Sequence, residues 1–211
     1  LEVETFLEKT VNHNHIYDYN SPKESIKKAP TPFTTSTLQQ SSSNEFKLSP
    51  KATMKACQSL YEGGFITYMR TDSTTYSEEF IEKMRKYIEK SYSYEYVRTD
   101  IQQLCLRNDK DTNTQEAHEA IRPTNIELEN VNKELGNNEY RVYRLIRRNT
   151  LESCMPPAKY SVIKAYISAP EELKYDYTAE QVIFPGWQIV NGYEKISEIY
   201  AYFKTLKRNS S

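Results

Sequence analysis

The alternation of apolar and polar positions predicts a helix with clear ends near the middle of the chain. In the stretch LSPKATMKACQSLYEGGF, Ser49 can cap a helix whose first position suits Pro50. The glycine pair Gly63 and Gly64 ends it. Its apolar face comprises Cys57, Leu60 and Tyr61.

Two further helices follow from the same helical period. Thr75 and Glu78 form a capping-box pattern ahead of a helix that runs to about Lys90. Its apolar side comprises Phe80, Ile81, Met84 and Ile88. The stretch 138–155 has Tyr143, Ile146, Thr150, Leu151 and Cys154 on an inward face, and Arg141, Arg144 and Arg148 on another.

Strand patterns are shorter. Residues 65–68 are aromatic and β-branched and predict a short strand, so that helix, strand and helix resemble a winged-helix-like module. The stretches AKYSVIKAYISA (158–169) and QVIFPGWQIV (181–190) predict antiparallel strands. Residues 1–20 have weak strand character. The hydroxyl-rich stretch TPFTTSTLQQSSSNEF (31–46) follows no stabilising pattern.

Length and composition add few constraints. The 211 residues suffice for one or two domains, and a net charge of -1 means that a polyanionic partner would have to meet a local basic surface. Cys57, Cys105 and Cys154 are far apart and form no CxxC pair, which argues against a zinc site and a disulfide framework. No apolar run is long enough to span a membrane. The first residue is Leu1, and we expect a piece of a larger protein.

The stretch FITYMRTDS carries the first candidate chemistry. The phenol of Tyr68 is a nucleophile once a nearby base or cation favours loss of its proton. Arg70 lies two residues on, which in a strand places both side chains on one face. Its guanidinium matches two phosphate oxygens, and the hydroxyls of Thr71, Ser73 and Thr74 can donate further hydrogen bonds. Simple packing of Tyr68 beside a surface charge is the alternative.

His118, in the stretch EAHEAIR, is the second candidate, because a charged imidazole can stabilise a phosphate. An ordinary surface histidine is the alternative, and HE alone lacks the HExxH spacing of a metal site. The third candidate is the arginine face of 138–155, which is either a contact to a nucleic-acid backbone or a solvated face diluted by Glu139 and Glu152.

Four stretches together resemble a known family. TPFTTSTLQQ, LYEGGFITYMRTDST, QEAHEAIRPT and MPPAKY occur in the order and approximate spacing of the type IA DNA topoisomerases, in their bacterial and viral topoisomerase I branch. The resemblance covers about residues 31–190. It implies that Tyr68 attacks a phosphodiester of single-stranded DNA and becomes linked to the 5′ phosphate, with Arg70 and His118 at the scissile phosphate. Strand passage and religation then relax negatively supercoiled DNA without ATP.

We expect further DNA contacts, and the resemblance implies an architecture. The DNA-binding residues are expected to be Thr67, Thr71, Asp72, Ser73, Arg122, Arg144 and Arg148. The expected fold class is α+β, with a mainly helical, winged-helix-like (CAP-like) catalytic domain at 45–155 inserted in an antiparallel β arch formed by 1–44 and 156–211.

The chain departs from the family in two places. SSSNEF stands where the family has a basic segment, and the acidic cluster that binds Mg²⁺ in the family belongs to a separate TOPRIM domain. We therefore expect no metal site here, with Mg²⁺ bound by an absent TOPRIM domain, and inefficient cleavage by this chain alone. The expected partners are single-stranded or negatively supercoiled DNA and the remaining domains of the parent polypeptide, with no membrane. An intracellular, cytoplasmic, nucleoid-associated or viral location follows. The alternative is a non-catalytic DNA-binding or structural module on the same scaffold.

Overall fold

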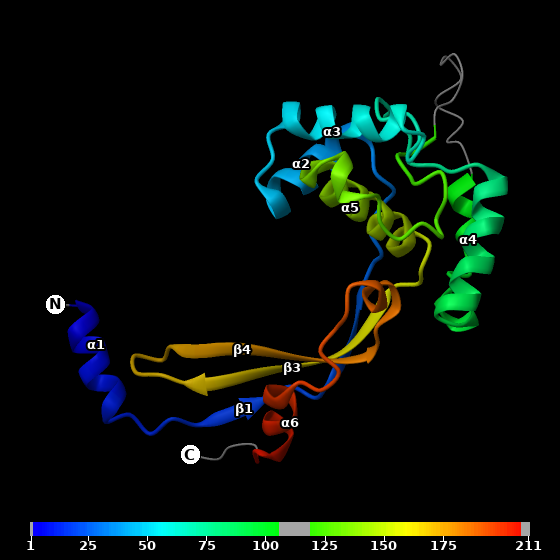
Figure 1. The fold of residues 1–211 in the computed structure, drawn as a ribbon. Coiled ribbons are helices and arrows are strands. Elements are labelled where there is room, and N and C mark those ends of the chain that lie inside the picture. The colour runs from blue at the N-terminus through cyan, green and yellow to red at the C-terminus, as the bar shows by residue number, and fades with distance from the viewer. Residues whose placement is uncertain (1, 106–118, 208–211) are drawn as a thin grey trace. The chain divides into compact units, whose positions relative to one another are not determined.

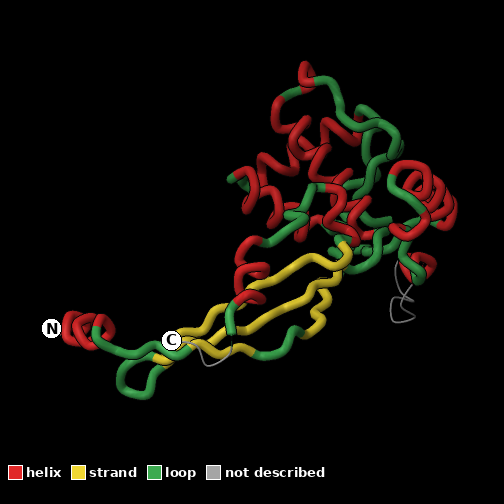
Figure 2. Tube along the Cα trace, turned by 90° about the horizontal axis from the view of Figure 1, so that it is seen from below, coloured by secondary structure: helices red, strands yellow, loops and turns green. Residues whose placement is uncertain are grey.

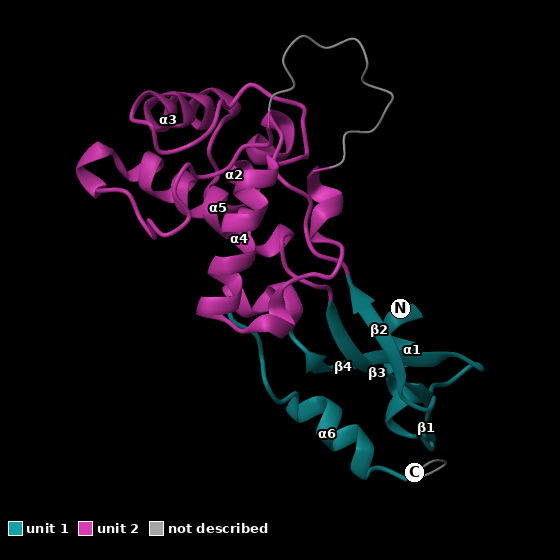
Figure 3. Ribbon diagram, turned by 90° about the vertical axis from the view of Figure 1, so that its right-hand side faces the viewer, with its two compact units in different colours: residues 1–27, 158–185, 192–211 teal, residues 28–157, 186–191 magenta. Residues whose placement is uncertain are grey.

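The computed structural model describes residues 2–105 and 119–207. The chain divides into two compact units, shown in different colours in Figure 3. Unit 1 consists of Leu1–Lys27, Ala158–Pro185 and Gly192–Ser211, and unit 2 of Lys28–Pro157 and Gly186–Asn191. Residues 28–44 therefore belong to unit 2, whereas the predicted first arch segment extends to residue 44. The functional roles of the predicted domains remain predictions.

Unit 1 is built on an antiparallel sheet whose central strand is β3 (Ala158–Ser168). Strand β4 (Lys174–Phe184) pairs along almost the whole of β3. The short strands β1 (Tyr17–Tyr19) and β2 (Lys23–Lys27) pair with successive halves of β3, at 165–167 and 158–162. The strands are drawn in yellow in Figure 2. The predicted antiparallel pair is confirmed at 158–168 and 181–184, whereas β4 begins at Lys174, seven residues before the predicted second strand. The strand prediction for PGWQIV (185–190) is wrong, because Gly186 takes φ +51° and Gly186–Val190 form the 3₁₀ helix η5.

Helices α1 (Glu2–Val11) and α6 (Glu198–Thr205) complete unit 1. The weak strand prediction for residues 1–20 is wrong over α1. Its first turn carries Glu2 and Glu4 and its last turn Lys9, the arrangement that a helix dipole favours. On α6, Tyr200 is buried and its hydroxyl lies 2.5 Å from Ser161 Oγ of β3.

Unit 2 is mainly helical and holds α2 (Thr35–Phe46), α3 (Pro50–Glu62), α4 (Glu78–Ser91) and α5 (Asn137–Ser153), labelled in Figure 1. Short 3₁₀ helices lie at Tyr94–Tyr96, Ile101–Cys105 and Lys133–Leu135. The α+β class, with a helical unit inserted in the chain between β2 and β3, is confirmed. Its winged-helix-like character remains a prediction.

Three helices form as predicted, for local reasons. Ser49 accepts the amide of Ala52 at the start of α3, with Pro50 in the first turn. Helix α4 buries the predicted apolar side, but its N-cap is Ser77 rather than Thr75, and it forms no capping-box bond. Helix α5 buries the whole predicted inward face, with Tyr143 fully enclosed and donating to the carbonyl of Leu128 (2.8 Å).

Helix α2 is the element that the pattern did not predict. Thr34 caps it, and a reciprocal capping box joins Thr34 and Thr37. Leu38 and Ser42 are buried. Serine and threonine have modest helix propensity, so capping and burial in unit 2 outweigh that preference.

Residues 65–68 do not form the predicted strand. Gly64 turns the chain at φ +74°, and among residues 65–68 only Ile66 takes part in a β-bridge, an isolated antiparallel one to Pro123. Tyr68 and Arg70 therefore do not share one face of a strand, and the contacts of their loop place them instead.

Candidate active site

Two of the predicted motifs lie side by side in unit 2. The amide of Thr67 donates to the carbonyl of Arg122 (2.9 Å), and its hydroxyl donates to the carbonyl of Ala120 (2.9 Å). In return, the amide of Arg122 donates to Thr67 Oγ1 (3.0 Å). The amide of Thr124 donates to the carbonyl of Phe65 (3.0 Å). Segments 65–67 and 120–124 are thus fixed against each other, with Thr67 serving as the connection between them.

A third motif holds the other side of the same loop. Thr35, at the start of α2, places its hydroxyl 2.8 Å from the carbonyl of Met69 and 3.1 Å from that of Thr71. The amide of Thr71 donates to Thr35 Oγ1 (2.9 Å), and the amide of Thr35 donates to the carbonyl of Thr71 (2.9 Å). The sequence pattern did not identify Thr35 as a residue of the site. The signal that could have identified it is its position directly after Thr34, which caps α2.

Tyr68 lies between these two anchors. Its neighbours Ile66 and Met69 are each 1% exposed, whereas Tyr68 is 36% exposed. Its ring packs edge-on against Tyr61, with 5.4 Å between ring centroids. The Tyr68 ring is thus supported by Tyr61 and partly exposed to solvent.

Arg70 is exposed, and in the described part of the chain no carboxylate forms an ion pair with it. A guanidinium without an acidic partner retains its capacity to bind a phosphate in bidentate geometry. The loop therefore presents a phenol and a cation from a rigid base.

The hydroxyls after Arg70 are used within the loop. Thr71 is buried, and its Oγ1 accepts the amide of Ser73 (3.0 Å). Ser73 Oγ accepts the amide of Thr75 (3.2 Å) and lies 3.0 Å from Thr75 Oγ1. Asp72 is exposed. Thr71 and Ser73 thus shape the turn that leads into α4, and their predicted contact with DNA remains a prediction.

Arg122 is held inside the protein. Its Nε donates to Glu119, its Nη1 donates to the carbonyl of Pro123 (3.1 Å), and its guanidinium lies 4.0 Å from the ring centre of Phe80. Burial acts to raise the pKa of Glu119, but the hydrogen bond and charge of Arg122 outweigh it, so the pKa of Glu119 is lowered. Arg122 is suited to fixing segment 119–124. His118 lies outside the described residues.

Arg144 and Arg148, the two arginines of α5 that were predicted to bind DNA, form no contact with the Tyr68 loop among the interactions of the described residues. Arg148 forms a two-pronged ion pair with Glu45 of α2, and Arg144 is exposed, with its guanidinium 5.6 Å from the ring centre of Tyr140. Because Glu45 already compensates the charge of Arg148, a DNA phosphate would have to compete with that carboxylate.

A cavity of about 730 Å³ lies between α2 and α5, with Glu152 in its wall. Burial raises the pKa of Glu152 to about 7, an effect that Arg148 opposes and Glu45 reinforces. Arg148 Nε lies 3.9 Å from the Glu152 carboxylate. This buried carboxyl is thus protonated in the folded protein at mildly acid pH.

The substitution Glu152→Gln is expected to stabilise the protein at alkaline pH. Since the folded pKa is above the unfolded value of 4.5, the folded state binds more protons between pH 4.5 and 7, and the wild-type protein loses stability as the pH rises through that range. Glutamine avoids this cost, which is about 3 kcal/mol above pH 7. Urea unfolding at several pH values measures it. An equal difference at every pH would contradict the assignment.

Within residues 2–105 and 119–207, no group of three or more His, Cys, Asp or Glu side chains is arranged to hold a metal ion. The residues present therefore do not fit Mg²⁺ binding within the described ranges. No helix that the structure describes is long and apolar enough to cross a membrane. The three cysteines are unpaired thiols.

Comparisons with known proteins identify the family of this chain. A family model described as DNA topoisomerase matches residues 2–210. DNA topoisomerase 1 of Buchnera aphidicola from Acyrthosiphon pisum is 39% identical, over 99% of this chain and 24% of the relative. A prokaryotic-type DNA topoisomerase 1 of Acanthamoeba polyphaga mimivirus is 36% identical, over 90% of this chain and 23% of the relative.

A solved structure, full-length topoisomerase I from Thermotoga maritima, superimposes with a TM-score of 0.69 at 31% identity, covering 92% of this chain and 32% of that one. The chain belongs to the DNA topoisomerase family, and the resemblance to the bacterial and viral topoisomerase I branch is confirmed. It spans about a quarter of the length of the curated relatives that it matches.

Proposed function

We propose that this chain supplies the nucleophile of a type IA DNA topoisomerase. Tyr68 Oη attacks the phosphorus of a phosphodiester in single-stranded DNA, a P–O bond forms to the tyrosine, and the bond to the 3′ oxygen breaks. The phenol loses a proton and the leaving 3′ oxygen gains one. After strand passage the 3′ hydroxyl attacks back, and because the phosphodiester is re-formed from a phosphotyrosine ester, no ATP is consumed.

One observation carries this proposal. Segment 65–71, bonded to segment 120–124 on one side and to Thr35 on the other, presents Tyr68 and Arg70 at the surface. A fixed nucleophile next to a cation that can bind phosphate is the arrangement that phosphoryl transfer needs, since catalysis of this step depends on positioning and charge stabilisation. His118 is proposed to contact the same phosphate.

The remaining requirements are proposed to come from outside this chain. Mg²⁺ is proposed to bind in a TOPRIM domain, and the chain alone is proposed to cleave DNA inefficiently. The proposed substrate is negatively supercoiled DNA with single-stranded character, in an intracellular setting that is cytoplasmic, nucleoid-associated or viral. The inserted helical unit is proposed to act as the winged-helix-like catalytic domain and the sheet unit as part of the arch.

Covalent trapping tests the proposal. This chain replaces the matching segment of the Buchnera relative, and the chimera is incubated with labelled single-stranded DNA and Mg²⁺. We expect a DNA adduct that mass spectrometry maps to Tyr68, and far less adduct with the 211-residue chain alone. An adduct on another residue would refute the site. A folded chimera that binds DNA but forms no adduct, while the unmodified relative reacts, would indicate a non-catalytic DNA-binding module instead.

A further inference from the structure

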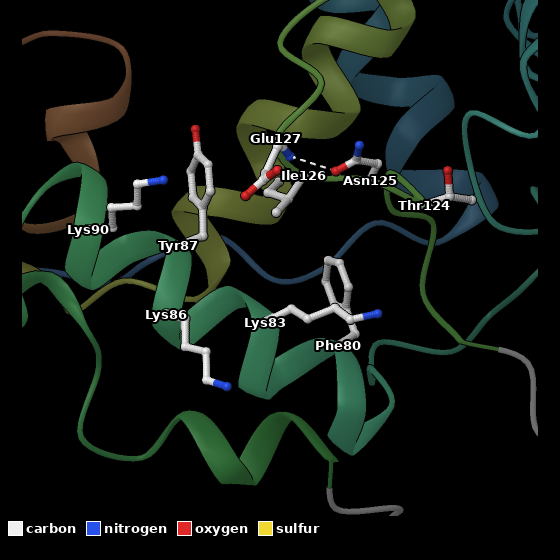
Figure 4. A pocket seen from close by; sticks show the side chains of 9 residues that line it. All are labelled: Phe80, Lys83, Lys86, Tyr87, Lys90, Thr124, Asn125, Ile126 and Glu127. Atoms are coloured by element: carbon white, nitrogen blue, oxygen red, sulfur yellow. Dashed lines mark hydrogen bonds between the residues drawn. The ribbon is translucent and has the colours of Figure 1, made fainter.

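A second surface of unit 2, here named the α4 groove, is a cavity of about 450 Å³ between helix α4 and segment 124–127 (Figure 4). Helix α4 contributes Phe80, Lys83, Lys86, Tyr87 and Lys90, and the facing segment contributes Thr124, Asn125, Ile126 and Glu127. Asn125 Oδ1 accepts the amide of Glu127 (3.0 Å), which holds the facing segment in a tight turn.

The groove has an excess of positive charge. Lys83, Lys86 and Lys90 are exposed, and their spacing places them along one side of the helix. Lys83 pairs with Glu79 (2.6 Å). The ion pairs of the described residues leave Lys86 and Lys90 without a carboxylate partner, and Glu127 is the acidic side chain in the lining.

The aromatic ring in the groove is held in place from behind. Arg147 of α5 donates through Nη2 to the hydroxyl of Tyr87 (2.7 Å) and through Nε to the carbonyl of Ile126 (3.0 Å). Like Lys86 and Lys90, Arg147 has no ion pair among those of the described residues. The guanidinium thus fixes the Tyr87 ring and adds a further positive charge next to the groove. A fixed ring costs little entropy when a base stacks on it.

The groove is linked to the candidate active site through segment 120–127. Phe80, in its lining, is the ring that contacts Arg122, and Thr124 is bonded to Phe65 of the Tyr68 loop. Segment 120–127 therefore runs from the nucleophile's loop to the groove. From Phe80 to Lys90, α4 extends about 15 Å, enough for a short stretch of a nucleic-acid strand.

We propose that the α4 groove binds the DNA strand near the scissile phosphate, with Lys86 and Lys90 contacting backbone phosphates and Tyr87 stacking on a base. The inference rests on the proposed function and extends its DNA-binding surface. Cationic side chains next to an aromatic ring are the combination that binds single strands without sequence preference. An acidic peptide matches the charge, but neither the ring nor the connection to the Tyr68 loop favours it.

The test compares two paired substitutions in the 211-residue chain. Lys86→Gln with Lys90→Gln removes the unpaired lysines, and Lys51→Gln with Lys55→Gln, at exposed positions of α3, is a control with the same charge change. Anisotropy of a labelled oligothymidine is measured across a salt series. We expect the groove variant to bind about tenfold more weakly at physiological salt, and its log-log salt slope to fall by about 1.4, since each single-strand phosphate contact contributes about 0.7. The control should change by less than about twofold.

Equal effects in the two variants, or no oligothymidine binding by the wild-type chain, would overturn the inference. An equal affinity for polyglutamate, with the same dependence on Lys86 and Lys90, would also overturn it and would indicate an acidic peptide as the ligand. So would binding of free thymidine bisphosphate that depends on these lysines while oligothymidine binding does not. Trapping in the chimera separates the two proposals. A Tyr68 adduct with unchanged DNA affinity in the groove variant refutes the groove alone. Lysine-dependent binding without any adduct refutes the cleavage function alone.

Discussion

Replacing Tyr68 with phenylalanine is expected to abolish the covalent DNA adduct and to lower the cleavage rate by at least about 10⁴-fold, the scale of loss when a nucleophile is removed. Only the attacking oxygen is lost. The phenyl ring can keep its edge-on contact with Tyr61, and the side chain is 36% exposed, so the free energy of unfolding should change by less than about 0.5 kcal/mol. Denaturing gel electrophoresis of labelled single-stranded DNA after quenching measures the adduct.

The matched control is Tyr61→Phe. Tyr61 belongs to the same aromatic pair and is 40% exposed, so it offers an accessible phenol one ring away. If Tyr68 is the nucleophile, this variant cleaves at nearly the wild-type rate. Retained adduct in Tyr68→Phe together with its loss in Tyr61→Phe would transfer the role to Tyr61. Retention of the DNA adduct in both variants would exclude Tyr61 and Tyr68 as the nucleophile.

The helices that the sequence predicted are those with local signals. Ser49 and Pro50 specify the start of α3, and the inward face of α5 has a regular helical period, so both could be read from neighbouring residues. Helix α2 lacks an apolar period. Its stability depends on a capping box and on burial of Leu38 in a core formed by distant residues, which a local pattern does not reveal.

The sequence predicted which residues form the candidate site, but not which of them face the solvent and which form hydrogen bonds within the protein. Tyr68 and Arg70 are presented at the surface, as the proposed chemistry requires. The hydroxyls of Thr67, Thr71 and Ser73 form hydrogen bonds within the protein instead. The bond of Thr67 joins residues 53 apart in sequence, so the sequence could identify the group but not its partner, whereas the bonds of Thr71 and Ser73 each span two residues.

Arg122 illustrates the same limit. In the sequence it is one more cation in a conspicuous motif. In the structure Glu119 pairs with it and Phe80 lies against its guanidinium, so its charge is largely committed to holding the segment. The acid three residues earlier could have suggested that pair, whereas the contact with Phe80 arises from the packing of α4 and could not have been predicted.

The second large effect is expected at Thr35. The substitution Thr35→Val is nearly isosteric, yet it leaves the carbonyl of Met69 and the amide of Thr71 without the hydroxyl that contacts them. The free energy of unfolding should fall by about 1–3 kcal/mol. Because the Met69–Thr71 segment follows Tyr68 directly, the nucleophile loses its alignment, and the single-turnover cleavage rate of the chimera should fall by about 100-fold. Oligothymidine affinity should change little, since the hydroxyl is bonded within the protein.

Two further variants separate positioning from a general loss of folding. Thr35→Ser keeps the oxygen and should restore most of the cleavage rate, while Ser36→Ala, at the next and exposed position, should leave it unchanged. Cleavage rates are compared at a temperature well below the unfolding transition of each variant, so that a loss of stability alone does not lower the rate. A folded Thr35→Val chimera that cleaves at the wild-type rate would show that Tyr68 is aligned without the hydrogen bonds of the Thr35 hydroxyl. Failure of serine to rescue the rate would show that the methyl group of Thr35, rather than its hydroxyl, positions the loop.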